Sequence, residues 1–284
     1  MLYNRLKSYG TGKPGSILNA CENSGYNQRV KKETGKETPA PLITQDLTEI
    51  GSGLRTAAAL VVNAYSAAET MSPQQTPPTD LAAGIEQFME VAQRLEQNTD
   101  PDAPAESKDI SQIGDYGIQL IAGLGNWADE LGLHETTEQL GKLILAVAGW
   151  IARQNGEIHS LDAVVDAIAG LANHLFDPES LVALLHFSDS LMDAIPMHMK
   201  DQTSDTNPSR PWRVLLLNRG IIATRSRNTE AMEQVYDQLI RHLPGDAEEF
   251  FSESMQQTTL QKYPAHIQAV VKRYYDRFTH RHMH

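Results

Sequence analysis

Apolar residues recur every three or four positions along most of this chain, and that spacing strongly limits what it can fold into. Residues three and four apart lie on the same face of an α-helix, so each apolar stripe predicts a helix with one buried face. Beyond residue 79 the stripes predict helices over about 109–131, 135–155, 161–176, 211–225, 229–242, 246–257 and 264–279, with others beginning at Thr79 and Asp177. Strand-like alternation is lacking, and the best strand candidate, 212–217, is short.

These helices are expected to form one all-α domain over residues 79–279. The connections between residues 130 and 180 are short, so consecutive helices should pack as antiparallel hairpins. Such hairpins form either an irregular bundle or a short α-solenoid. Trp127 and Trp150 are each followed within five or six residues by a glycine, which favours a repeating hairpin of the solenoid type.

The two ends of the chain follow different patterns. Residues 1–43 lack apolar periodicity and are rich in glycine and lysine, so we expect a disordered N-terminal segment. Residues 44–69 regain helical spacing and predict an isolated or loosely docked helix. Because the acidic, patterned region begins near Met71, one hypothesis is that residues 1–70 are an upstream extension. Residues 280–284 form a histidine-rich tail.

Charge and cysteine content restrict the compartment and the partners. The formal net charge is −12, and residues 71–206 hold 22 acidic residues against 5 basic ones, an excess that repels nucleic acid and anionic lipid. The single Cys21 cannot close an intramolecular disulfide, which favours a cytoplasmic protein. The longest nearly unbroken apolar stretch, 143–152, is half of the roughly 20 residues that a membrane span needs. We therefore expect no membrane span, and a protein rather than a nucleic acid as partner.

No set of residues forms a recognisable catalytic pattern. Residues 123–128, GLGNWA, fit a dinucleotide fingerprint, but the segment before them is helical in pattern and residues 141–149 contain no acid for a ribose. We interpret these glycines as small residues that let two helices approach closely. The sequence therefore favours a non-enzymatic interaction or adaptor module without a cofactor.

One helix offers a possible ligand or metal site. His186, Asp189 and Asp193 share a helical face, and a histidine beside carboxylates can bind a metal or act as a base. The alternative interpretation is a solvated stripe opposite the apolar face of the same helix. If the site is real, the protein binds a small molecule or a metal and could be an enzyme.

A second candidate surface is a basic segment, 207–227, that contains no acidic residue. Its candidate docking residues are Arg210, Trp212, Arg213, Arg219, Arg225 and Arg227. Arginines near an aromatic ring can bind phosphate or stack on a base, but these do not align on one helical face as a helix that reads a nucleic-acid groove would require. We expect the arginines to pair with the acidic body, and the alternative is a docking surface for an acidic protein partner.

Overall fold

The computed structural model describes residues 42–68, 75–97, 106–200 and 210–279, and this part of the chain consists of eleven α-helices with no strand. The predicted all-α fold is confirmed. The helices are α1 (Leu47–Ala67), α2 (Pro78–Gln97), α3 (Ser107–Glu130), α4 (His134–Arg153), α5 (Leu161–His174), α6 (Pro178–Met192), α7 (Met197–Lys200), α8 (Pro211–Ser226), α9 (Thr229–His242), α10 (Ala247–Leu260) and α11 (Ala265–Thr279).

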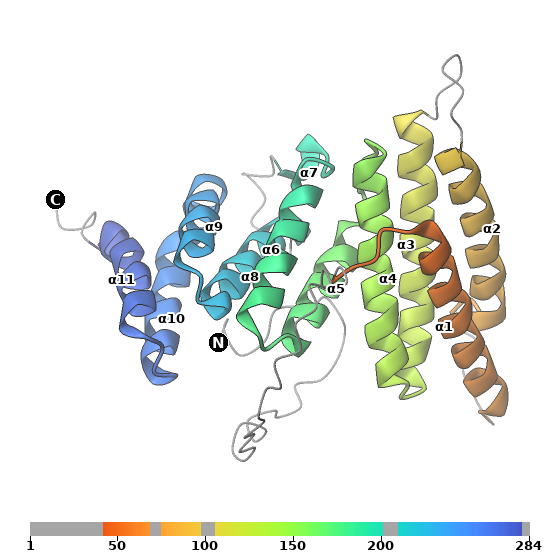
Figure 1. Cartoon of the computed structure of the whole chain (residues 1–284), viewed down its shortest axis with the longest axis horizontal. Coiled ribbons are helices and arrows are strands. Elements are labelled where there is room, and N and C mark those ends of the chain that lie inside the picture. Colours follow the sequence, from red (N-terminus) through yellow and green to blue (C-terminus); the bar gives the residue numbers. More distant parts are fainter. Residues whose placement is uncertain (1–41, 69–74, 98–105, 201–209, 280–284) are drawn as a thin grey trace, which may run out of the picture.

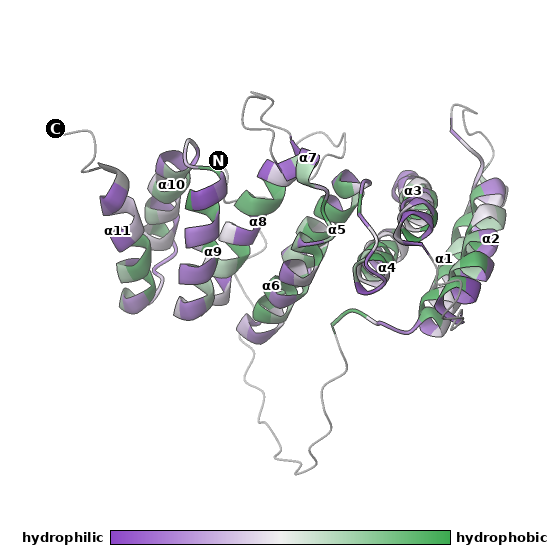
Figure 2. Cartoon of the chain, turned by 90° about the horizontal axis from the view of Figure 1, so that it is seen from above, coloured by the Kyte–Doolittle hydropathy of each residue, from purple (hydrophilic) through white to green (hydrophobic). Residues whose placement is uncertain are grey.

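The helices stand side by side in an elongated array (Figure 1). At one end α1, α2, α3 and α4 pack as a four-helix group, in which α1 contacts α2 and α4, and α3 contacts the same two helices. From α4 onward the chain steps away through α5, α6 and α8 to the pair formed by α10 and α11 at the far end (Figures 1 and 2). Within the described residues, no helix is both long and apolar enough to cross a membrane.

Two helices, α4 and α8, form the centre of this array. In α4 every residue from Leu143 to Ile151 is buried, and in α8 all but a few residues are buried. A helix that is apolar on all sides must be surrounded by other elements. Accordingly α4 contacts α1, α3, α5 and α6, whereas α8 contacts α5, α6 and α9. The apolar run 212–217, the best strand candidate, belongs to the buried helix α8, in agreement with the helix predicted over 211–225.

Local polar signals set several helix ends. The Asp177 carboxylate accepts from Ser180 N at 2.7 Å and begins α6, as the Asp-Pro-Glu sequence predicts. At α9 the capping side chain is Asn228, which accepts from Ala231 N at 3.1 Å, one residue before the predicted cap. The helix ending at Met192 stops before Pro196, in line with the missing amide hydrogen of proline.

Helix α1 is an integral part of the array, in contrast to the isolated or loosely docked helix that the sequence suggested. Ile50, Leu54 and Val61 have no solvent exposure, and α1 contacts α2, α3 and α4. Ile43 is also buried, so packing begins before residue 44. The expected disorder of the N-terminal segment falls on residues 1–41, and the histidine-rich tail on 280–284, both outside the described residues.

The docking of α1 can be tested with two substitutions on the same helix. Leu54→Ala should lower the free energy of unfolding by about 2–5 kcal/mol, because it leaves a cavity against α2 and α4. Leu60→Ala, at a side chain that is 48% exposed, should change it by less than about 0.5 kcal/mol. Urea denaturation of both variants measures the difference, and equal small effects would show that α1 is loosely attached.

Candidate functional site

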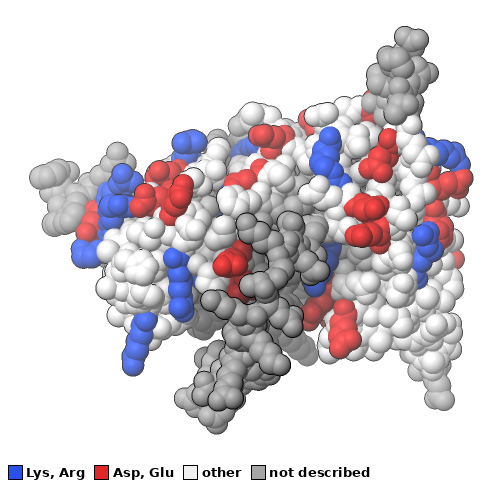
Figure 3. Space-filling view, viewed as in Figure 1, with Lys and Arg blue, Asp and Glu red and all other residues white. Residues whose placement is uncertain are grey.

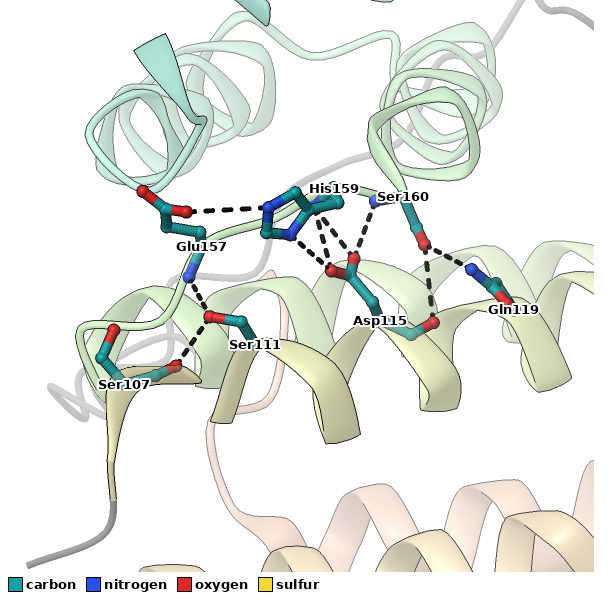
Figure 4. A network of polar contacts seen from close by, with 7 residues as sticks. All are labelled: Ser107, Ser111, Asp115, Gln119, Glu157, His159 and Ser160. Atoms are coloured by element: carbon teal, nitrogen blue, oxygen red, sulfur yellow. Dashed lines mark hydrogen bonds and ion pairs between the residues drawn. The ribbon is translucent and has the colours of Figure 1, made fainter. Parts of the chain in front are cut away.

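A buried carboxylate on α3 fixes the start of α5 (Figure 4). Asp115 is 8% exposed, and its oxygens accept from His159 N at 3.0 and 3.1 Å and from Ser160 N at 2.7 Å. His159 Nδ1 lies 2.9 Å from the same carboxylate. Ser160 occupies the N-cap position of α5 but makes no side-chain cap bond, so Asp115 caps this helix from a neighbouring one.

Further polar residues extend this contact along α3. Ser111 Oγ accepts from Glu157 N at 2.7 Å and donates to Ser107 O at 2.7 Å, while Gln119 Nε2 donates to Ser160 Oγ at 3.3 Å (Figure 4). Since Asp115 and Ser111 both accept backbone N–H groups of the α4–α5 loop, their role is to hold that loop on α3. We call these contacts the Asp115 clasp.

About one helical turn beyond the clasp, a groove opens between α3 and α5 with α4 as its floor. Its volume is about 740 Å³. Small residues from all three helices line it, together with a few apolar and charged ones. The small residues are Ala122, Gly125, Gly141, Ala163, Ala167 and Gly170. We call this feature the α3–α5 groove.

The three glycines of the groove differ from those that bring helices together. A Cβ atom built on Gly125, Gly141 or Gly170 would meet no protein atom within 4 Å. By contrast, a Cβ on Gly117 would lie 2.6 Å from the Phe88 ring, where α2 and α3 cross closely. The predicted close approach of helices therefore does not apply to Gly125, which faces open space. A glycine inside a helix costs roughly 0.5–1 kcal/mol relative to alanine, and the packing of the described residues does not require it here.

The lining of the groove carries an acidic excess, and an exposed aromatic residue follows it in the chain. The lining includes Asp129, Glu138 and Asp166 but only one basic residue apart from histidine, Lys142. His174, also on the lining, contacts Gly170 O through Nδ1 and Glu138 through Nε2, both at 2.9 Å. Phe176, which follows the lining residue Leu175, is 85% exposed. A large exposed aromatic side chain beside a groove is typical of a binding surface.

The predicted arginine surface is mostly turned inward. Arg213 Nε donates to Asp246 at 2.8 Å, and Arg225 donates to the carbonyl oxygens of Ala172 and Leu175 at 2.9 and 2.7 Å. Trp212 is 3% exposed. Because α8 is surrounded, these side chains and Arg219 cannot form one exposed docking surface.

The remaining two members of this set lie at the ends of α8. Arg210 is half-buried at its N-cap, and Arg227 is exposed at its C-cap, with its guanidinium over the Tyr263 ring at 5.1 Å.

Arg219 is the most deeply buried charge of the described chain. It has no exposure, and its guanidinium pairs with Asp189 of α6, whose side chain is 41% exposed. Burial lowers the pKa of Arg219, and the neighbouring Asp189 opposes this shift. The guanidinium atoms Nε and Nη1 have no hydrogen-bond partner among the described residues. Asp189 therefore serves to neutralise Arg219.

The expected metal site is not assembled by the fold. His186 and Asp193 are exposed on α6 and at its C-cap, while Asp189 contacts Arg219. In the part of the chain that the structure describes, no three His, Cys, Asp or Glu side chains are placed to share a metal ion.

The structure instead brings the two predicted sets together at a pocket between α6, α7, α8 and α9. Asp189 and Asp193 line this pocket with Trp212, and its volume is about 530 Å³. Sequence reasoning missed its other polar lining residues, Lys200, Gln238, Arg241 and His242. They come from two segments far apart in the chain, so no local pattern could have grouped them. We call this feature the α6–α9 pocket.

Acidic and basic side chains are interspersed on the face that Figure 3 shows, and neither sign forms a continuous patch there over the described residues. Comparison with models of protein families, with curated proteins and with solved structures finds no match.

The Arg219–Asp189 pair should respond asymmetrically to substitution. Asp189→Asn leaves a buried guanidinium without a counter-charge and should lower the free energy of unfolding by about 2–3 kcal/mol. The loss is smaller than for a fully buried ion pair, because Asp189 is partly exposed. Arg219→Met fills a similar volume and leaves a carboxylate that water reaches, so it should cost less than about 1 kcal/mol. Denaturant midpoints of the two variants give the order, and the reverse order would contradict the burial of Arg219.

The Asp115 clasp predicts a second, independent effect. Asp115→Ala removes the acceptor of two backbone N–H groups at the start of α5 and should lower the free energy of unfolding by about 2–3 kcal/mol. Asp129→Ala, at an exposed carboxylate on the same helix, is the matched control and should stay within about 0.5 kcal/mol of the parent. Comparable stabilities of the two variants, measured in urea, would show that the clasp contributes little.

Proposed function

We propose that this protein is a non-enzymatic, cytoplasmic adaptor that binds a helical segment of another protein in the α3–α5 groove. The observation that carries the proposal is the open space at Gly125, Gly141 and Gly170, on three successive helices. Small residues on all three helices allow the backbone of a guest helix to come close, as small residues do wherever helices pack tightly. Such a helix-in-groove arrangement is a common form of peptide recognition.

The chemistry of the lining narrows the kind of segment that fits. Three acidic residues against one lysine favour a guest helix with basic residues beside its apolar face. Phe176, which follows α5, is exposed to water and offers an aromatic side chain for a guest helix to cover. The groove therefore suits a basic amphipathic helix with small residues on its contact face.

The Asp115 clasp supports the same proposal because it holds the walls of the groove in place. It ties the α4–α5 loop to the N-terminal half of α3, adjacent to the groove. Binding to a groove whose walls are already held in place costs less conformational entropy than binding to one that must first be ordered. Asp115 would thus position the groove walls without touching the guest.

Filling the groove tests the proposal without disturbing the core. Gly141→Ala and Gly170→Ala should each raise the free energy of unfolding by about 0.5–1 kcal/mol, because alanine is the better helix former and has room. Gly141→Leu combined with Gly170→Leu should keep the fold but occupy the groove. Affinity capture from the native lysate, with cross-linking to locate the contact, should then recover a stoichiometric partner with the parent and not with the double leucine variant.

The matched control is Gly245→Leu, at a turn residue outside the groove whose Cβ would also meet nothing within 4 Å. It should capture the partner as the parent does. Circular dichroism and thermal unfolding check that all variants remain folded. Equal capture by the filled variant, cross-links outside α3–α5, or the absence of any partner with the parent would each contradict the proposal.

A further inference from the structure

The α6–α9 pocket gathers cationic side chains around one buried indole. Lys200 ends α7, Trp212 lies in the first turn of α8, and Arg241 and His242 end α9. Lys200 Nζ lies 5.8 Å from the centre of the Trp212 ring, and the His242 ring meets the same indole edge-on with centroids 5.6 Å apart. The four side chains therefore surround one small volume, although they come from three different helices.

Two of these cations have no carboxylate partner among the described residues. No carboxylate among the described residues forms an ion pair with Lys200 or Arg241, whereas Arg213 and Arg219 of the adjoining helix each have an aspartate partner. Both also line the pocket, so their charges face a space that a ligand can enter. Unpaired cations from separate elements that converge on a cavity are typical of a binding site for an anion.

The carboxylates of the pocket do not cancel this charge. Asp189 is paired with Arg219, and the exposed Asp193 lies at the C-cap of α6. Counting Lys200, Arg219 and Arg241 against the two aspartates leaves one positive charge in excess.

Burial and neighbouring positive charges both act on the imidazole of His242. Its pKa is lowered first by burial and then by the positive charges of Arg241, Lys200 and Arg219. The imidazole is therefore neutral near pH 7 and can donate or accept a hydrogen bond.

We propose that the α6–α9 pocket binds a small phosphorylated molecule, with its phosphate group between Lys200 and Arg241 and beside His242. Arginine can bind a phosphate through two parallel hydrogen bonds, and lysine adds a point charge. The volume of about 530 Å³ exceeds what one phosphate fills and lies within the range of small-molecule sites. The remaining lining from Met192, Met197 and Trp212 suits an apolar or aromatic part of the ligand. This site is separate from the α3–α5 groove and does not depend on the adaptor proposal.

The buried polar atoms of this region fit the same assignment. Trp212 Nε1 and Gln238 Oε1 both belong to lining residues, and neither has a hydrogen-bond partner among the described residues. A buried polar group without a partner has lost its hydrogen bonds to water, and a ligand that replaces them is favoured. A ligand with both donor and acceptor groups could satisfy these atoms after a small rotation of the two side chains.

Sulfate is the first probe, because it mimics phosphate and keeps its charge between pH 5 and 8. The full-length protein is titrated with sodium sulfate, against sodium chloride of equal ionic strength, while NMR follows the His242 ring protons. A bound dianion stabilises the imidazolium form, so saturating sulfate should raise the pKa of His242. By linkage, sulfate should bind more tightly as the pH falls through that pKa. No shift of the His242 titration beyond that in chloride would overturn the proposal.

Variants then locate the site and test the size of its ligand. Lys200→Gln combined with Arg241→Gln should weaken sulfate binding at least tenfold, whereas the control Lys142→Gln, in the α3–α5 groove, should leave it within twofold. Phenyl phosphate should bind at least tenfold more tightly than inorganic phosphate if the rest of the pocket holds an organic group. Unchanged binding in the double variant would overturn the site, and equal affinity for the two phosphates would overturn the assignment to a phosphorylated molecule.

Discussion

The fold depends on enclosing two helices that are buried on nearly every side, α4 over Leu143–Ile151 and α8 over most of its length. A helix such as α4 or α8 is stable in water only when neighbours cover its whole circumference. Helix α4 obtains this cover from α1, α3, α5 and α6, and α8 obtains it from α5, α6 and α9. The elongated array follows, because each central helix collects its own ring of partners and α5 and α6 serve both (Figure 1).

This arrangement also decides where polar chemistry can occur. Arg219 lies on α8 and is drawn inside with it, so Asp189 must neutralise a charge that water does not reach. At the N-terminal end of the same helix, Lys200, Arg241 and His242 lie at a pocket with few charges to oppose them. At α4 the surrounding helices leave one open strip between α3 and α5. The glycines that line this strip leave space in it that side chains would otherwise fill. The two proposed sites therefore sit beside the two enclosed helices.

Much of the secondary structure could be predicted because its causes are local. The apolar spacing, the Asp177–Pro178 start and the position of Pro196 gave most helix bounds to within a few residues. Helix caps could not be predicted from neighbouring residues where a side chain from another helix makes or prevents the capping contact. Ser160 and Asp246 occupy N-cap positions without making side-chain cap bonds, since Asp115 caps α5 and Asp246 is engaged by Arg213. The run 212–217 belongs to the helix predicted over 211–225, and only the tertiary structure decided that this helix is buried on nearly every side.

The sequence by itself determined that this chain is helical. Its apolar residues recur every three or four positions, and that local spacing alone places them on one face of a helix. It also determined the segregation of charge, including the acid-free segment that became α8. The tertiary structure alone decided which charges meet. Arg219 joins Asp189 across 30 residues, and Lys200 approaches His242 across a longer stretch of chain. Such contacts depend on how the helices pack, since they join residues that share no local spacing in the sequence.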